Sequence, residues 1–182
     1  MKYQTIVIDP PWPIKMRGSV KARPNQAKEL PYNTMTFEEI ENLSIGSIAE
    51  QGAHIYLWST NATLRKSFEV LEKWGVNYHL TLVWVKPSAI APCFAYKFAT
   101  EFCLLGFYGK PMKKFIGAGK LNWLSHFTKA GEHSKKPECF IDLVESMSPA
   151  PRIELFARRH RMGWDVWGNE VESDIDLTPK GE

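Results

Sequence analysis

The apolar residues of the chain follow two alternating patterns. Short, dense runs rich in β-branched and aromatic side chains predict buried strands at residues 6–8, 54–58, 78–85, 102–108 and 152–156. Between several of these runs apolar residues recur every three or four positions, which predicts helices from Thr36 toward Leu43, from Asn61 to Trp74 and after Pro137. Strands that alternate with helices indicate an α/β fold with a mostly parallel, doubly wound sheet, whose ligands bind at the carboxyl ends of the strands.

Two long segments show neither pattern. Residues 14–32 and 109–120 are polar, basic and aperiodic, and loops of this length in a compact domain are usually functional. Their cations are our candidates for contacts with a nucleic-acid backbone: Lys15, Arg17, Lys21, Arg23, Lys113 and Lys114. A basic run by itself is more often only a solvated surface, so this interpretation depends on a base-binding site nearby.

The composition is that of a globular protein. The chain has 182 residues and a formal net charge of +3, and its 44% hydrophobic residues exclude disordered, collagen-like and disulfide-scaffold proteins. We expect one domain over residues 1–170 and an acidic C-terminal tail at 171–182. No apolar run reaches the roughly 18–20 residues of a membrane span and no signal peptide is recognisable, so the sequence predicts a cytoplasmic protein.

The cysteines and histidines form no metal-binding pattern. Cys93, Cys103 and Cys139 contain no C-x-x-C pair, so we expect neither a structural zinc site nor a disulfide framework. His126 and His133 have no partner at metal-ligand spacing. The sequence therefore predicts reduced thiols, mostly in the core, and no metal.

The sharpest chemical feature is the tetrapeptide Asp9-Pro10-Pro11-Trp12, directly after the first predicted strand. Its two prolines remove two backbone donors and hold the chain extended. The Asp9 carboxylate and the Pro10 carbonyl are then acceptors, and Trp12 is a stacking surface. This combination suits a planar base that carries an amino group, although a lone Asp-Pro pair is more often an ordinary turn.

Further short motifs follow this tetrapeptide in a fixed order. They are Leu30-Pro31-Tyr32 with Met35, Tyr56-Leu57-Trp58, Trp84-Val85-Lys86, Glu101 through Gly106, Lys136-Pro137, Ile153-Glu154-Leu155-Phe156-Ala157-Arg158 with His160, and Gly168-Asn169. From about Tyr3 to Glu170 the sequence resembles the MTA-type N6-adenine methyltransferases, relatives of the catalytic subunit of the messenger-RNA adenosine methyltransferase. A single four-residue motif is a moderate indication, whereas this many motifs in one order are a strong one.

The resemblance implies a Rossmann-like methyltransferase fold with helices on both faces, S-adenosylmethionine as cofactor, and a permuted order with the catalytic motif before the cofactor motif. Asp9, Pro10, Pro11 and Trp12 match the catalytic motif that holds the adenine amino group. The chemistry agrees, because the amino nitrogen is a poor nucleophile whose lone pair is delocalised into the ring. Accepting its hydrogens favours a more pyramidal nitrogen, and an in-line displacement then needs neither a metal nor a covalent intermediate.

Other matching positions imply contacts with the cofactor. The expected residues are Asp9, Lys136, Glu154, Phe156, Arg158, His160, Asn169 and Glu170. Lys136 would meet the cofactor carboxylate, and Asn169 with Glu170 would hold the ribose hydroxyls. Without the resemblance, Glu154 inside a strand is an edge acid or a functional acid at even odds, and residues 158–161 are more often a solvated basic surface.

Three residues are candidates for contact with the target base. Tyr32 and Trp84 offer stacking surfaces, and Lys86 lies close to Trp84 in the sequence. Trp84 stands in an apolar strand, so a place in the core is equally expected. The target base must be flipped out of a duplex or already unpaired, and the two basic loops would then clamp the strand.

The sequence departs from the family at a few positions. Lys135 stands where His often precedes Lys-Pro, Arg161 replaces an Asn, and Glu170 replaces a common Gln. The short chain suggests a bacterial or phage enzyme, so DNA is the expected substrate ahead of RNA. The alternatives are an RNA N6-adenosine methyltransferase, a cytosine amino methyltransferase and a non-catalytic nucleic-acid-binding partner subunit. A homodimer or a partner chain is also plausible.

Overall fold

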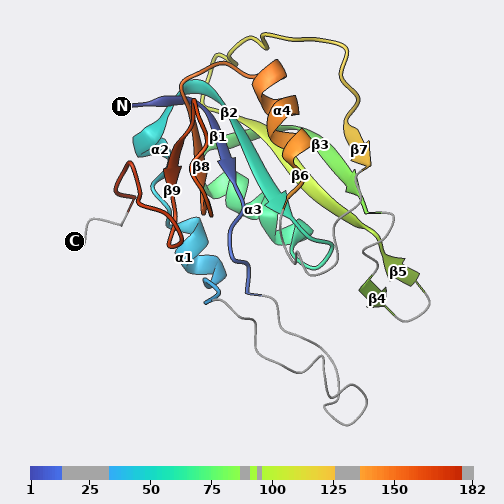
Figure 1. Cartoon of the computed structure of the whole chain (residues 1–182). Helices are drawn as coiled ribbons and strands as arrows, with labels where there is room; N and C mark the ends of the chain where they lie inside the picture. Colours follow the sequence, from blue (N-terminus) through green and yellow to red (C-terminus); the bar gives the residue numbers. More distant parts are fainter. Residues whose placement is uncertain (14–32, 87–90, 94–95, 126–135, 178–182) are drawn as a thin grey trace.

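The computed structural model describes residues 1–13, 33–86, 91–93, 96–125 and 136–177 (Figure 1). A seven-stranded sheet has the order β7-β3-β6-β2-β1-β8-β9. Its strands are β1 (Tyr3–Ile8), β2 (Ala49–Ser59), β3 (Val76–Val85), β6 (Thr100–Tyr108), β7 (Trp123–Ser125), β8 (Arg152–Leu155) and β9 (Asp165–Trp167). A separate hairpin pairs β4 (Ala91–Cys93) with β5 (Tyr96–Phe98). The helices are α1 (Phe37–Glu41), α2 (Ile45–Ile48), α3 (Leu64–Lys73) and α4 (Glu138–Met147).

The sheet is mixed but mostly parallel. Strands β2, β1, β8 and β9 pair parallel to one another, and β3 pairs parallel to β7. Only β6, among the described strands of this sheet, runs the other way, because it is antiparallel to both β2 and β3. The predicted α/β class and the mostly parallel sheet are therefore confirmed.

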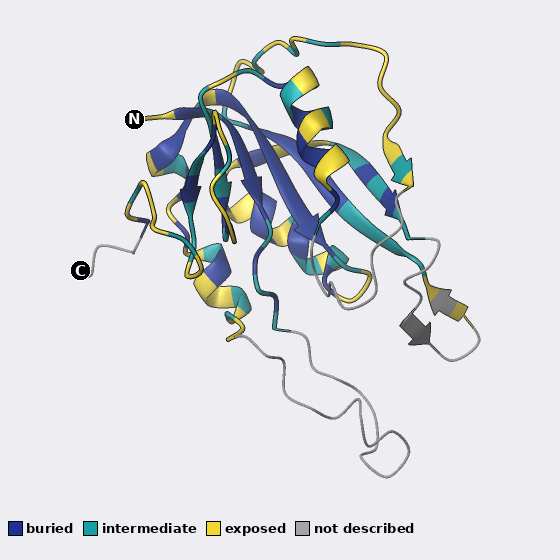
Figure 2. Ribbon diagram, in the orientation of Figure 1, coloured by how far each residue is buried: buried dark blue, intermediate teal, exposed yellow. Residues whose placement is uncertain are grey.

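Helices cover both faces of the sheet (Figures 1 and 2). Helices α1, α2 and α3 pack on one face and α4 on the other. Side chains alternate along β1 between these two cores, with Ile6 and Ile8 in the first and Val7 in the second. This alternation decides that Asp9, two residues after Val7, faces the same side of the sheet as α4.

The predicted helices form where the sequence places their start signals. The Thr36 side chain accepts a hydrogen bond from the Glu39 backbone at 3.1 Å, and Glu39 accepts one from the Thr36 backbone at 2.6 Å, which is the capping box that begins α1. Helix α4 follows Pro137 and buries Phe140, Ile141 and Val144. The short elements α2, β4, β5, β7 and β9 were not predicted, because segments of three or four residues carry too little periodicity to detect.

The described part of the predicted acidic tail packs on the domain. Leu177 is buried in the core that contains α1, α2 and α3. The Asp174 backbone donates a hydrogen bond to the Val166 carbonyl at 2.9 Å, and the Asp174 carboxylate accepts one from the Val166 backbone at 2.8 Å. These bonds occupy the outer edge of β9 and attach residues 174–177 to the sheet.

The described cysteines differ in burial. Cys103 is buried as expected, but Cys139 is exposed on α4. No helix among the described residues is both long enough and apolar enough to cross a membrane.

A buried hydrogen-bond network, called the polar relay below, holds the loop after β6 against the sheet. His54 of β2 lies 3.0 Å from the Lys113 carbonyl through Nε2 and 2.7 Å from the Ser148 hydroxyl through Nδ1. A carbonyl only accepts, so Nε2 carries the hydrogen and Nδ1 accepts from Ser148. The Ser148 oxygen then accepts from the Tyr56 hydroxyl at 2.8 Å. At Gly52, whose φ is 76°, any side chain would collide with the Pro111 carbonyl, so the loop approaches β2 closely.

We predict that His54→Gln lowers the free energy of unfolding by about 1–3 kcal/mol at pH 8, because it breaks this relay. Burial lowers the pKa of His54, so below pH 6.5 the unfolded chain takes up a proton more readily than the folded one. The wild type therefore loses stability as the pH falls, by at most about 1.4 kcal/mol per pH unit from this group, and the variant does not. Urea unfolding at pH 8 and pH 5.5 should show the difference between the two proteins shrinking.

Tyr56→Phe is the matched control for this prediction. It removes one bond of the same relay without removing a group that titrates in this range, so its loss of stability should not change with pH. A deficit of His54→Gln that is equal at both pH values would contradict the assignment of the neutral ring.

Candidate functional site

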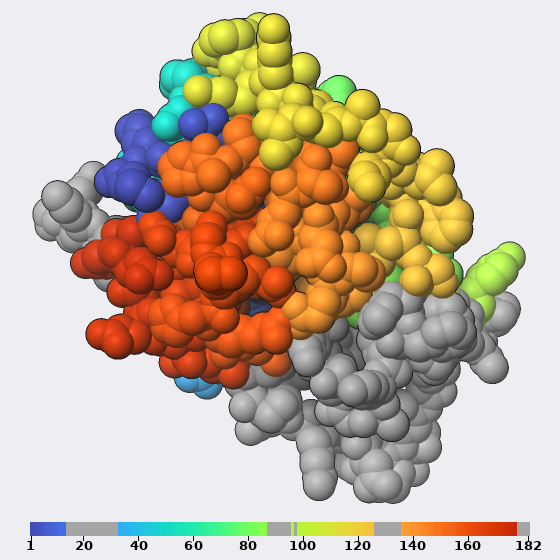
Figure 3. All heavy atoms as spheres, turned by 45° about the horizontal axis from the view of Figure 1, so that its top comes forward, coloured from blue at the N-terminus to red at the C-terminus, as the bar shows by residue number. Residues whose placement is uncertain are grey.

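The predicted catalytic motif opens onto a cavity at the carboxyl edge of the sheet. The cavity measures about 160 Å³ and lies between α4 on one side and β1, β8 and the segment after β8 on the other (Figure 3). Its lining residues are Val7, Asp9, Trp58, Lys136, Pro137, Glu138, Phe140, Ile141, Glu154, Phe156, Arg158, Arg159 and Arg161. Five of the eight predicted cofactor residues, Asp9, Lys136, Glu154, Phe156 and Arg158, therefore share one cavity.

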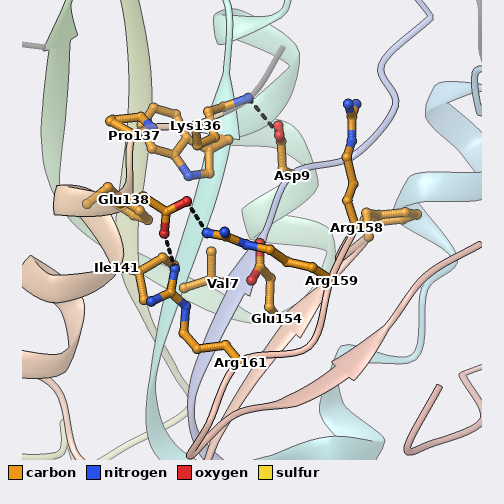
Figure 4. A pocket seen from close by; sticks show the side chains of 13 residues that line it. Val7, Asp9, Lys136, Pro137, Glu138, Ile141, Glu154, Arg158, Arg159 and Arg161 are labelled. Atoms are coloured by element: carbon orange, nitrogen blue, oxygen red, sulfur yellow. Dashed lines mark hydrogen bonds and ion pairs between the residues drawn. The ribbon is translucent and has the colours of Figure 1, made fainter. Parts of the chain in front are cut away.

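A line of alternating charges crosses the edge of the sheet beside this cavity. The Lys136 ammonium lies 2.6 Å from Asp9 Oδ2 and 3.5 Å from Glu101 Oε2. Glu101 also pairs with Lys86. Figure 4 shows Lys136 reaching from the segment before α4 toward Asp9. The reversed direction of β6 brings Glu101 here, because the start of an antiparallel strand meets the carboxyl ends of its neighbours.

The electrostatics of this cluster keep Lys136 charged. Burial alone would lower the pKa of Lys136, but Asp9 and Glu101 outweigh it and raise that pKa. Burial raises the pKa of Asp9 above its usual value, and the Lys136 ammonium offsets only part of that rise. Lys136 also lies 5.1 Å from the centre of the Trp58 ring, which adds a cation–π contact.

The two prolines shape a tight turn after β1. The Trp12 backbone donates to the Pro10 carbonyl at 2.8 Å, and the Met35 backbone donates to the Pro11 carbonyl at 2.9 Å. Each carbonyl oxygen can accept a second hydrogen bond, so the Pro10 carbonyl keeps capacity for a ligand.

The expected stacking role of Trp12 is wrong. The ring is 4% exposed, its Nε1 donates to the Trp58 carbonyl at 2.9 Å, and it packs against Phe37. Its indole hydrogen bond joins the turn after β1 to the end of β2. Trp12 therefore fixes the position of Asp9 rather than offering a face to a base.

The structure places the candidates for base contact in different surroundings. Trp84 is 2% exposed and lies edge-to-face with Trp58 at 6.1 Å, so it is a core residue and not a stacking surface. Lys86 reaches the edge of the site through its ion pair with Glu101, and its ammonium lies 5.0 Å from the Trp84 ring. Tyr32 lies outside the described residues.

The end of β8 supplies the opposite wall of the cavity. Glu154 is not on a sheet edge, because β8 lies between β1 and β9. Burial raises the pKa of its carboxyl, and the nearby charge of Asp9 raises it further. Phe156 has φ 63°, a left-handed conformation that is rare for a bulky residue and is found most often at functional sites. Gly168 lies against it, where a Cβ atom would come within 2.6 Å of the Ala157 carbonyl.

The remaining predicted cofactor residues lie outside the lining of the cavity. His160, Asn169 and Glu170 are all exposed. Arg158 pairs with Glu170 at 3.4 Å, which brings the segments after β8 and after β9 together. Their proposed roles on the ribose or methionine end of a cofactor stay predictions.

The basic loops are only partly described. Lys15, Arg17, Lys21 and Arg23 lie outside the described residues. Lys113 and Lys114 do not line the cavity, and their contact with a nucleic-acid backbone stays a prediction. Because β6 is antiparallel, the loop after it begins at the opposite, amino edge of the sheet, where Lys113 pairs with Glu50 at 2.9 Å.

Sequence reasoning gave no role to three residues at this site. Glu101 was noted only as part of a motif, and Glu138 and Arg159 were not singled out. Glu138 pairs with both Arg159 and Arg161 (Figure 4). The available signals were that Glu101 comes just before an apolar run and that Glu138 stands at the start of a helix. Neither signal predicts which cation the carboxylate pairs with.

No cluster of three or more potential metal ligands is present in the described ranges. The polar groups at this edge are instead arranged as ion pairs and as a cavity lining of four cations and three carboxyl groups. Such a lining suits an organic ligand that carries charges of both signs.

Comparison with known proteins gives one consistent family. The MT-A70 family model matches residues 3–170. The Type II methyltransferase M.MunI of a Mycoplasma species is 32% identical, with 100% of this chain and 83% of M.MunI covered. A putative N(6)-adenosine-methyltransferase MT-A70-like protein of Medicago truncatula is 30% identical over 99% of this chain and 28% of its own length. The human N(6)-adenosine-methyltransferase catalytic subunit METTL3 is 28% identical, with 98% and 30% covered.

The chain thus spans most of M.MunI but under a third of these plant and human relatives. The matched region contains the complete sheet, the Asp9-Pro10-Pro11-Trp12 turn and the cavity wall after β8. Its mixed, mostly parallel sheet with helices on both faces is the Rossmann-like fold expected of these enzymes. The chain belongs to the MT-A70 family of N6-adenine methyltransferases.

Proposed function

We propose that this protein transfers a methyl group from S-adenosylmethionine to the N6 amino group of adenine in nucleic acid, with DNA as the substrate. The observation that carries the proposal is the position of Asp9. It follows β1 at the carboxyl edge of the sheet, in the family's catalytic tetrapeptide, and it faces a cavity with residues fit for the cofactor.

The role of Asp9 follows from the chemistry of the amino group. Its carboxylate accepts a hydrogen of the adenine amino group, and the Pro10 carbonyl accepts the other. The nitrogen lone pair then becomes available, and the positive charge that develops on nitrogen is stabilised by the Asp9 carboxylate. Oδ1 of Asp9 takes no part in the pair with Lys136, which uses Oδ2.

Lys136 and Glu101 keep Asp9 ready for this role. The ammonium of Lys136 favours the ionised form of Asp9, which can only accept hydrogen bonds. Glu101 holds the same ammonium from the other side, at 3.5 Å. Fixed partners of this kind orient a catalytic carboxylate before the substrate arrives, so little reorganisation is needed during the reaction.

The chemistry of the lining fits S-adenosylmethionine. The carboxyl groups of Asp9 and Glu154 suit its cationic end, the side chains of Lys136 and Arg158 suit its carboxylate, and Phe156 offers an apolar surface. When bound, the cofactor supplies an activated methyl group.

The preference for DNA rests on the relatives. The similar protein matched over most of its length, M.MunI, is named a Type II methyltransferase. The relatives named for adenosine, the ribonucleoside, are matched over under a third of their length. RNA is the substrate to test beside it.

We predict that Asp9→Asn lowers methyl transfer by about 10²- to 10⁴-fold, because the amide donates where the carboxylate must accept and carries no charge. Binding of the cofactor should persist. The assay incubates the protein with methyl-labelled S-adenosylmethionine and single- and double-stranded DNA and RNA, and digests the product for nucleoside mass spectrometry.

Asp142→Asn makes the same chemical change at an exposed site on α4 and should leave the rate unchanged. Full activity of Asp9→Asn would refute the role of Asp9. A wild type that binds the cofactor but methylates no pool would indicate a non-catalytic or partner-dependent subunit, and methylated cytosine would reassign the target base.

Lys136→Met should move the acid limb of the pH profile of kcat/KM to higher pH. Without the ammonium, burial and the neighbouring carboxyl groups raise the pKa of Asp9 further, so more alkaline solution is needed to ionise it. The variant should also lose about 1–3 kcal/mol of stability, since a part-buried carboxylate loses its partner. Lys120→Met, on an exposed loop, is the control, and an unshifted acid limb would contradict the coupling.

A further inference from the structure

We propose that Glu138 is a positioning residue that clasps Arg159 and Arg161 across the cavity, and that this clasp must release for the cofactor to enter and leave. The inference rests on the proposed function, because it concerns the exchange of that cofactor. It assigns a role to three residues of this chain that the methyl-transfer chemistry itself does not use.

The geometry joins the two walls of the cavity. Glu138 is the first residue of α4, and Arg159 and Arg161 belong to the segment after β8. Arg159 pairs with one oxygen of the Glu138 carboxylate and Arg161 with the other. All three residues line the cavity, so the ion pairs run between its walls and not along one of them (Figure 4).

The ion pairs of the clasp are directional but partly exposed to solvent, so they can both hold the two walls together and break reversibly. One carboxylate that receives two guanidinium groups forms charge-assisted bonds in fixed directions. Burial would raise the pKa of Glu138, but Arg159 and Arg161 outweigh it and lower that pKa, so the carboxyl group stays ionised at neutral pH. Glu138 and Arg159 are about half exposed, and pairs of this kind are screened by salt.

The neighbouring residues explain why this opening matters to a ligand. Asp9, Lys136 and Glu154 lie in the same cavity as the clasp, and Lys136 is only two residues before Glu138. A ligand that contacts these groups lies beside the three charged side chains that line the same cavity. Its release then depends on breaking the two ion pairs, which makes the dissociation rate the sensitive quantity.

A double-mutant cycle on dissociation tests the proposal. The probe is S-adenosylhomocysteine, the demethylated product, and its dissociation from the protein of residues 1–182 is measured by stopped-flow chase. Glu138→Gln and Arg161→Gln should each speed dissociation by about three- to tenfold, the range for partly exposed pairs. The double variant should be no faster than the faster single variant, because both changes break the same clasp.

Salt provides a readout that a merely structural role would not move. Raising the salt concentration should speed dissociation from the wild type and should have much less effect on Glu138→Gln, which has no charge left to screen. Arg159→Gln leaves α4 unchanged and serves as the second variant if Glu138→Gln unfolds. Asp142→Asn on the same helix should dissociate at the wild-type rate.

The outcomes separate the clasp from the proposed function. If the wild type binds S-adenosylhomocysteine and the clasp variants release it at the wild-type rate, or if their effects simply add, the clasp is refuted while the function stands. If the wild type binds neither cofactor nor product, the proposed function fails and the clasp with it. Faster, non-additive release that loses its salt dependence supports the clasp.

Discussion

The ion pair between Asp9 and Lys136 organises the site more than any other contact. It joins Asp9, at the end of β1, to Lys136, two residues before α4 begins. The two residues are 127 positions apart in the sequence, and Lys136 Nζ lies 2.6 Å from Asp9 Oδ2. Either group alone would destabilise the protein there, because a part-buried charge that loses its partner costs about 1–3 kcal/mol. Asp9 and Lys136 therefore form one unit: the ammonium offsets part of the cost of burying the carboxylate, and the pair joins the segment before α4 to the sheet.

The single reversed strand extends this unit into a network. Because β6 enters between β2 and β3 in the opposite direction, its first residues lie where the neighbouring strands end. Glu101 thereby meets Lys86, which follows β3 at this edge, and Lys136, which precedes α4. The same reversal carries the loop after β6 to the far edge, where His54 holds it. The antiparallel direction of β6 therefore places Glu101 at the carboxyl edge of the sheet and the loop after β6 at the amino edge.

Much of this arrangement was predictable, and the failures share a cause. Periodicity, the capping box at Thr36 and the prolines after β1 predicted the fold class and most elements, because these signals are local. The cavity residues Lys136 and Glu154 were found through ordered motifs. Trp12 was misjudged and Trp84 was left open between base contact and core, since aromatic side chains look the same in sequence whether they stack on a ligand or pack in a core. The edge of the sheet at which Lys113 lies was not predictable, because the residues of a strand do not encode whether it runs parallel or antiparallel to its neighbours.

The charged side chains at this edge of the sheet form an inner, more buried cluster and an outer, more exposed one. The inner cluster of Asp9, Lys136 and Glu101 is mostly buried, so its interactions are little screened and suit a fixed orientation for chemistry. The outer cluster of Glu138, Arg159 and Arg161 is more exposed, so its interactions are weaker and reversible. The two clusters meet before α4, because Lys136 of the inner cluster lies two residues before Glu138 of the outer one. With a rigid inner pair beside a looser outer one, the outer ion pairs can open while the Asp9 carboxylate stays in place.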